Sequence, residues 1–222
     1  MNPAALFDPS AAAIVVGGTA LATFLRCGTT NCALVATSLA QLGRKHFDAE
    51  RTKAELAVQV RQIQQDGLLR ASPRHFGDRE FDEATDALIG RRSVAALLAA
   101  HEGHKARRIE ASNRAATTLA QASELAPVFG LAGTLISLSQ LPADGIAHGA
   151  YAGAIGMAVL TTLYGLLLAN LLLAPLARVI ERAASAEERE RQSVVDWLAA
   201  QVAPALHPPA PRGRAPVLDH AA

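Results

Sequence analysis

Hydroxyl and amide side chains interrupt two long apolar stretches that contain no Asp, Glu, Lys or Arg. They comprise Thr134, Ser137 and Ser139 in one stretch and Thr161, Thr162, Tyr164 and Asn170 in the other. Hydroxyl oxygens can bind a partly hydrated cation or order water, whereas proton relays within membranes use ionisable side chains. A single hydroxyl more often bonds back to its own helix or to a neighbouring one. The cluster nevertheless favours a cation path whose titratable acid comes from another chain.

Three apolar runs are long enough to cross a bilayer, which needs about 20 helical residues and at least about 17. They lie within residues 9–25, 125–141 and 145–177. The first run is not typical of a cleaved signal peptide, because Asp8 stands where a positively charged segment is expected. We therefore expect an all-α integral membrane protein with three transmembrane helices and a helical cytoplasmic domain.

Composition excludes several functions. The chain is 50% hydrophobic and 18% charged, and 21 basic against 20 acidic residues give a net charge of +1, so we expect no nucleic-acid partner. Cys27 and Cys32 are too few to frame a disulfide-rich fold or a zinc site. His101 and His104 in HEGHK lack the spacing of a zinc enzyme and are interpreted as helix-surface residues. We expect no enzyme activity, cofactor or metal.

The block between the first two spans has the pattern of water-soluble helices. Over residues 49–65, Leu56, Val60 and Ile63 form one apolar stripe, and Gly67 ends the segment. A second helical region begins near Phe81, and a long helix runs from Ser93 toward Glu124 and into the second span. After the third span, a charged amphipathic helix is expected to place Val179, Val194, Trp197 and Leu198 on its apolar face.

The distribution of charge predicts the domains and their orientation. The expected segments are a first transmembrane helix and its exit (1–43), a cytoplasmic helical domain (44–124), a transmembrane hairpin (125–177), a cytoplasmic amphipathic helix (178–203) and a Pro-rich disordered tail (204–222). Lys and Arg gather in 44–124 and 178–203, so both are expected inside, while the linker 142–149 lies outside. The N-terminus then lies outside, which suggests either that an upstream helix is missing or that an ancestor of the chain had one.

The expected spans contain glycines at close spacing and have a proline at their inner ends. Gly130 and Gly133, and the GxxxG pair Gly149 and Gly153, allow helix backbones to approach closely. Pro127 and Pro175 stand at the expected inner ends of the paired spans, where each removes one intrahelical hydrogen bond and permits a bend. Each proline is either a boundary marker or part of a hinge that transmits force.

Three segments resemble the MotA/TolQ/ExbB family of ion-driven motor channels, and most closely its flagellar MotA-type branch. LAPVFGLAGTLISLSQL (125–141) resembles the family's span with Ala-Pro, Gly and Gly-Thr-Leu. AIGMAVLTTLYGLLLANLLLAPLARVIE (154–181) resembles its Thr-Thr-Leu-Tyr-Gly span with the following proline, and FDPSAAAIVVGG is similar to its second helix. Together these segments cover about a third of the chain.

The resemblance implies a homo-oligomeric, pentameric ring in the bacterial inner membrane, around two helices of a MotB-like partner whose membrane Asp carries H⁺ or Na⁺. The residues that match the family's motifs would have distinct roles. Thr134, Thr161 and Thr162 would line the ion path, Pro127 and Pro175 would couple ion passage to movement, and Gly130, Gly133 and Gly165 would serve packing.

The cytoplasmic segment departs from the flagellar branch. The glutamates expected near the rotor are absent from QQDGLLRASPRH (64–75), where Arg61, Arg70 and Arg74 are candidate replacement contacts to a flagellar rotor protein. The acids in REFDEATD are interpreted as a solvated helix face. A TolQ/ExbB-like energy-coupling channel for an envelope complex, and a non-conducting membrane scaffold derived from the family, are the alternatives.

Overall fold

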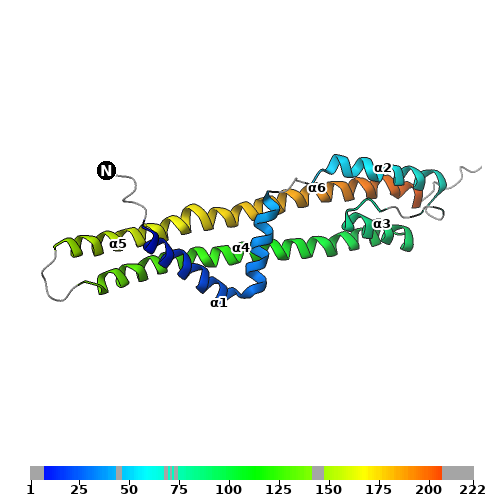
Figure 1. The fold of residues 1–222 in the computed structure, drawn as a ribbon. Coiled ribbons are helices and arrows are strands. Elements are labelled where there is room, and N and C mark those ends of the chain that lie inside the picture. Colours follow the sequence, from blue (N-terminus) through cyan, green and yellow to red (C-terminus); the bar gives the residue numbers. More distant parts are fainter. Residues whose placement is uncertain are drawn as a thin grey trace, which may run out of the picture. The chain divides into compact units, whose positions relative to one another are not determined.

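The computed structural model describes residues 8–43, 47–67, 70, 72, 75–141 and 148–206, and all regular elements in these ranges are helical (Figure 1). In chain order they are α1 (Pro9–Leu42), α2 (Ala49–Asp66), α3 (Arg79–Arg91), α4 (Val94–Ser139), α5 (His148–Leu167), a π-helical segment (Leu168–Leu173) and α6 (Ala174–Leu206). The prediction of an all-α protein is confirmed. Residues 142–147 of the predicted outside linker and most of the Pro-rich tail lie outside the described residues, while α5 begins at His148 within the linker.

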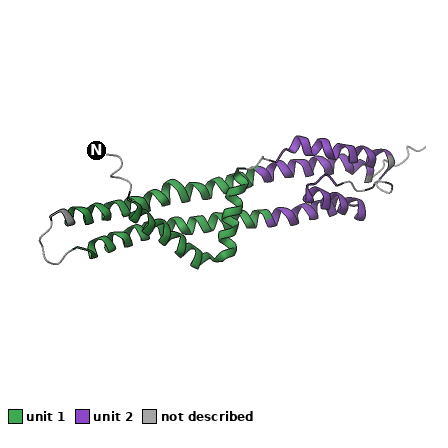
Figure 2. Cartoon of the chain, viewed as in Figure 1, with its two compact units in different colours: residues 1–45, 108–186 green, residues 46–107, 187–222 purple. Residues whose placement is uncertain are grey.

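The chain divides into two compact units (Figure 2). Unit 1 contains residues 1–45 and 108–186, and unit 2 contains residues 46–107 and 187–222. Helices α4 and α6 each contribute residues to both units. Three helical stretches are long and apolar enough to cross a membrane, namely Pro9–Leu42, Val94–Ser139 and Tyr151–Ala205. The prediction of three spanning helices is therefore confirmed.

Helix α1 begins at a well-defined cap and contains a kink. The carboxylate of Asp8 accepts hydrogen bonds from the backbone N–H groups of Ser10 and Ala11, and Pro9 occupies the first helical position. At Gly28, φ is 77° and ψ is 169°, a backbone conformation that is essentially restricted to glycine. The helix is therefore kinked at Gly28, which separates two helical parts of α1.

Helix α2 has the boundaries that its sequence predicts. Asp48 caps its first turn by accepting from the backbone N–H of Arg51, and the N–H of Gly67 closes its last turn onto the carbonyl of Ile63. The apolar stripe is buried, because Leu56 and Ile63 are each only 1% exposed. Both the helix over 49–65 and its termination at Gly67 are confirmed.

The long helices continue through the predicted membrane boundaries. Helix α4 is unbroken from Val94 to Ser139 with Pro127 inside it, so the predicted cytoplasmic helix does lead directly into the second span. Helix α6 follows the π-helical segment without a break and reaches Leu206, past the predicted start of the tail. The placement of Val179 on the apolar face of this helix was wrong, since it is 44% exposed. Its neighbours Ala177 and Ile180 carry the buried face instead.

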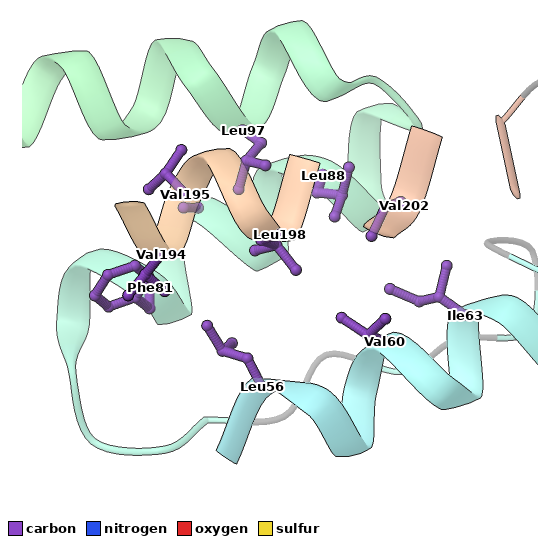
Figure 3. Packing of buried hydrophobic residues seen from close by; sticks show 11 residues of the cluster. Leu56, Val60, Ile63, Phe81, Leu88, Leu97, Val194, Val195, Leu198 and Val202 are labelled. Carbon is purple, nitrogen blue, oxygen red and sulfur yellow. The ribbon is translucent and has the colours of Figure 1, made fainter. Parts of the chain in front are cut away.

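Unit 2 has an apolar core built from all four of its helical segments (Figure 3). Leu198 and Val194 of α6 lie among Leu56 of α2, Phe81 of α3 and Leu97 of α4. The remaining buried members are Val60, Ile63, Ala84, Leu88, Val195 and Val202. Because the core draws on segments far apart in sequence, α6 must return to α2 and α3 before unit 2 can fold.

We expect Gly67→Ala to destabilise the protein by about 1–3 kcal/mol, because φ 74° and ψ 163° strain any residue with a Cβ. An added Cβ meets nothing within 4 Å, so the effect isolates backbone strain. The matched control is Gly103→Ala in the interior of α4, which also has open space and should stabilise by about 0.5–1 kcal/mol. Thermal unfolding of the full chain in detergent measures both. Equal changes in melting temperature would contradict the assignment of strain to Gly67.

Candidate functional site: the hydroxyl-lined helix pair

The backbones of α4 and α5 approach closely in unit 1, and three glycines lie at the contact. A Cβ on Gly165 would come within 2.7 Å of the carbonyl oxygen of Ala126 and 3.1 Å of the Cα of Gly130. A Cβ on Gly130 would come within 3.0 Å of the carbonyl oxygen of Thr161, and one on Gly133 within 2.8 Å of the Thr161 Cβ. Rising numbers on α4 meet falling numbers on α5, so the two helices are antiparallel. A larger residue at Gly165 would overlap the backbone of α4, while one at Gly130 or Gly133 would require neighbouring groups of α5 to shift.

The close contact places Thr161 at the centre of the helix pair. Its side chain is fully buried against Gly133, and its hydroxyl donates to the carbonyl of Ala158 at 2.9 Å. Thr162 donates to the same carbonyl at 3.3 Å, and Thr134 donates to the carbonyl of Leu131 at 2.6 Å. Thr134 and Thr162 are half-buried in the single subunit. The structure thus brings Thr161 into the interface and leaves the other two at its margins.

Each of these hydroxyls uses its proton within its own helix. Ser137, Ser139 and Asn170 do the same, donating to the carbonyls of Gly133, Ile136 and Leu166. The expectation that single hydroxyls bond back to their helix is confirmed. A hydroxyl that donates once still offers oxygen lone pairs, so such a row can accept from water or bind a cation but supplies no titrating group.

Asp8 is an acid of unit 1 that contacts α5, but its carboxylate serves another purpose. The backbone N–H of Asp8 donates to the Tyr164 hydroxyl at 3.1 Å, which ties the start of α1 to α5. The Asp8 carboxylate itself caps α1 through Ser10 and Ala11. Further along α1, a Cβ on Gly18 would overlap the Phe129 ring of α4, so α1 packs closely on the pair as well.

The two prolines occupy different local structures. Pro127 lies at the glycine contact, where its Cα would be 3.2 Å from a Cβ on Gly165, and α4 continues through it. Pro175 is the second residue of α6, which begins directly after the π-helical segment. A proline ring clashes with the carbonyl four residues earlier, here that of Leu171, and the wider π turn relieves such a clash. Hence α5 and α6 join at a widened turn, a feature that sequence reasoning treated only as a bend.

The candidate rotor contacts belong to unit 2. Arg61 is exposed on α2, opposite the buried stripe of that helix, and Arg70 is exposed in the turn that follows it. Arg74 lies outside the described residues. The structure therefore leaves two of the three guanidinium groups on the surface of unit 2.

The acidic residues of REFDEATD (79–86) do not all lie on a solvent-exposed face of α3. Glu80 is 3% exposed, and one of its carboxylate oxygens accepts from Arg191 at 2.8 Å. Asp82 accepts from the backbone N–H of Phe76, while Glu83 is exposed and pairs with Arg79. The hydrogen bond from Arg79 lowers the pKa of Glu83 from its usual value, and His104 adds to this effect.

Arg191 is the centre of the charge network in unit 2. Its guanidinium also bonds Asp78 at 3.0 Å and Glu187 at 2.8 Å, and its Cζ lies 4.3 Å from the centroid of the Phe47 ring. Burial opposes the charge on Arg191, but Glu187 and the charges of Asp78 and Glu80 outweigh it, so the pKa of Arg191 is raised. Sequence reasoning missed this network because its members come from helices that are distant in the chain.

The prediction that His101 lies on a helix surface was wrong, since His101 is only 1% exposed and contacts Glu80 of α3. His104 lies nearer the surface, with a side chain that is 16% exposed, and contacts Glu83. No group of three or more His, Cys, Asp or Glu side chains is placed to hold a metal ion within the ranges that the structure describes.

A sequence model of the MotA/TolQ/ExbB proton channel family matches residues 74–193. No curated protein sequence matches the chain. Among solved structures, C. jejuni MotAB is similar with a TM-score of 0.80 and 17% identity over 91% of this chain and 81% of that one. The flagellar MotAB stator complex from Bacillus subtilis is similar with a TM-score of 0.77 and 20% identity over 89% and 79%. At these identities the likeness concerns the fold.

We expect Gly165→Ala to destabilise unit 1 by about 1–3 kcal/mol, the range typical of overpacking, because the methyl group would overlap the Ala126 carbonyl. The matched control is Gly156→Ala, also on α5, where a Cβ meets nothing within 4 Å. Thermal unfolding of the full chain in detergent distinguishes them. An unchanged melting temperature for Gly165→Ala would show that the two backbones do not approach as described.

Proposed function

The chain belongs to the MotA/TolQ/ExbB proton channel family, and we propose that it is the MotA-like subunit of an ion-driven motor, a multi-pass protein of the bacterial inner membrane. In this role the passage of H⁺ or Na⁺ along the α4–α5 pair drives movement of the subunit against its partner. The observation that carries the proposal is a pair of apolar stretches, residues 125–141 and 145–177, that carry hydroxyls and contain no acid.

The missing acid identifies the kind of partner. A cation path needs a group that binds and releases the ion, and the Asp8 carboxylate already caps α1. We therefore assign the titrating carboxylate to a MotB-like single-span protein with an Asp in its membrane helix. Both similar structures are MotAB complexes, which supports a partner of this kind. A pentameric ring of this chain around two such helices completes the proposed assembly.

The proposed roles of individual residues follow from their positions. Thr161 lies in the α4–α5 interface with Thr162 and Thr134 at its margins, so these three would line the ion path. Pro127 lies at the glycine contact and Pro175 at the widened turn, which suits both for coupling ion passage to movement of unit 2. The exposed Arg61 and Arg70, with Arg74, would contact a rotor protein of the flagellum.

Co-expression with a single-span protein that carries a membrane Asp should yield a complex with more copies of this chain than of the partner. Native mass spectrometry of the purified complex gives the ratio. The control is a partner whose Asp is replaced by Asn, which should still assemble but should conduct no ions. A chain that remains monomeric beside the partner, or conducts cations alone, would contradict the proposal. A partner that serves an envelope complex instead of a flagellar motor would favour the TolQ/ExbB-like alternative.

Within that complex, Thr161→Val should lower ion flux at least tenfold, a barrier increase of about 1.4 kcal/mol, because it removes the hydroxyl and keeps the shape. Thr161→Ser retains the hydroxyl and should restore most of the flux. A third variant, Thr37→Val, removes an exposed hydroxyl that bonds Leu34 on α1 and should have no effect. Flux into vesicles that contain the complex is the measurement. Full flux with Thr161→Val would show that this hydroxyl is not part of the ion path, whereas the absence of flux through the wild-type complex would support the non-conducting scaffold.

A further inference from the structure

Helices α2, α3 and α6 end at the same end of the unit 2 core (Figure 3). Their last core residues lie towards this end, namely Ile63, Leu88 and Val202. A hydrogen bond of 3.1 Å from the Gln64 side chain to the carbonyl of Gln201 joins α2 to α6 there. Because α4 follows α3 after a short turn, its first residues belong to the same end. We call the described residues of 61–70, 87–100 and 197–206 the arginine end of unit 2.

The arginine end is basic and its charges are exposed. The three segments contain four arginines, Arg61, Arg70, Arg91 and Arg92, against one acid, Asp66. All four arginines are exposed, and none of them forms an ion pair within the part of the chain that the structure describes. This end therefore presents a net positive charge to its surroundings.

Exposed arginines elsewhere in unit 2 have partners on their own helix. Arg51 pairs with Glu55 at 3.0 Å, and Arg79 pairs with Glu83 at 2.8 Å. The positions three and four residues away from Arg61 and Arg91 hold no acid, so no such pair can form along α2 or α3. The guanidinium groups of the arginine end are thus available to another molecule.

Arg92 has a backbone conformation that favours glycine. It caps the C-terminal end of α3 with φ 52° and ψ 40°, and among the described residues it is the only one besides glycines with a positive φ. Glycine is usual at this position of a helix end, because a Cβ is strained in the left-handed region. Arg91 in the last turn of α3 already gives the helix dipole a cation. Strain without a local benefit is typical of a functional position.

We propose that Arg91 and Arg92 are contact residues for an acidic protein surface, which in the proposed motor is a surface of the rotor protein. The inference rests on that proposed function and adds the α3–α4 turn to the contacts assigned to Arg61 and Arg70. Guanidinium groups form paired, charge-assisted hydrogen bonds with carboxylates. Since these arginines have no ion pair to give up, an acidic partner gains their full interaction, and the positive end attracts it over a distance.

The variant Arg92→Gly separates a contact role from a structural one. It should raise the melting temperature of the chain in detergent by about 2 °C, because it relieves the strained backbone. In cells whose motor contains this chain and its partner, it should lower swimming speed about twofold, the factor by which one exposed ion pair changes a binding constant. The matched control, Arg189→Ala, removes an exposed arginine of α6 outside the arginine end and should swim as wild type.

The acidic character of the partner is tested by reversing the charge. Aspartate tolerates the left-handed region, so the double variant Arg91→Asp with Arg92→Asp should fold and should not swim. Swimming revertants of this variant should carry substitutions that replace an acid of a rotor protein by a neutral or basic residue. Revertants that replace only basic residues of the rotor would overturn the assignment of an acidic surface.

Ion flux into vesicles that contain the same complex distinguishes the possible failures. Flux should equal that of the wild type in every variant, because the arginine end is not part of the ion path. A wild-type complex without flux would overturn the proposed motor function and the contact with it. Normal flux together with wild-type swimming of the double variant would overturn the contact alone. A lower melting temperature for Arg92→Gly would show that Arg92 serves the fold instead.

Discussion

The rest of unit 1 depends on the direct contact between the α4 and α5 backbones at Gly130, Gly133 and Gly165. In a bilayer the hydrophobic effect does not hold helices together, so association relies on close packing and on hydrogen bonds between polar groups. Because three positions at this contact are glycine and carry no side chain, the two helix backbones can approach each other directly. That contact buries Thr161, and it leaves the lone pairs of its hydroxyl inside the pair and not facing lipid.

The spans of unit 1 contain no charged side chains, whereas unit 2 buries several, and the different surroundings of the two explain this difference. The paired spans contain no charged side chain, since an ion in hydrocarbon is costly unless it serves a function. Unit 2 buries charges but compensates them, as Arg191 does with Asp78, Glu80 and Glu187 beside the Phe47 ring. Such networks are sensitive to substitution, because the removal of one member leaves an uncompensated buried charge. Unit 2 is therefore held in one arrangement by polar contacts as well as by its apolar core.

These properties fit a subunit that works only in an assembly. The spans provide oxygen lone pairs and close packing but contain no acid, and α4 and α6 each contribute residues to both units. A widened turn ahead of Pro175 gives the α5–α6 connection room to adjust without breaking.

Local patterns in the sequence were sufficient wherever the relevant neighbours are close along the chain. The bounds of α2, its end at Gly67, the continuity of α4 and the three spans all follow from capping residues, apolar periodicity and run length. The positions of His101, Glu80 and Val179 could not be predicted in this way. Whether such a side chain is buried depends on helices that lie far away in sequence, and only the folded chain brings Glu80, His101 and Gln192 together. The tertiary structure also decided that Gly165 meets Ala126, because a glycine pattern shows that helices can approach but not which residues they meet.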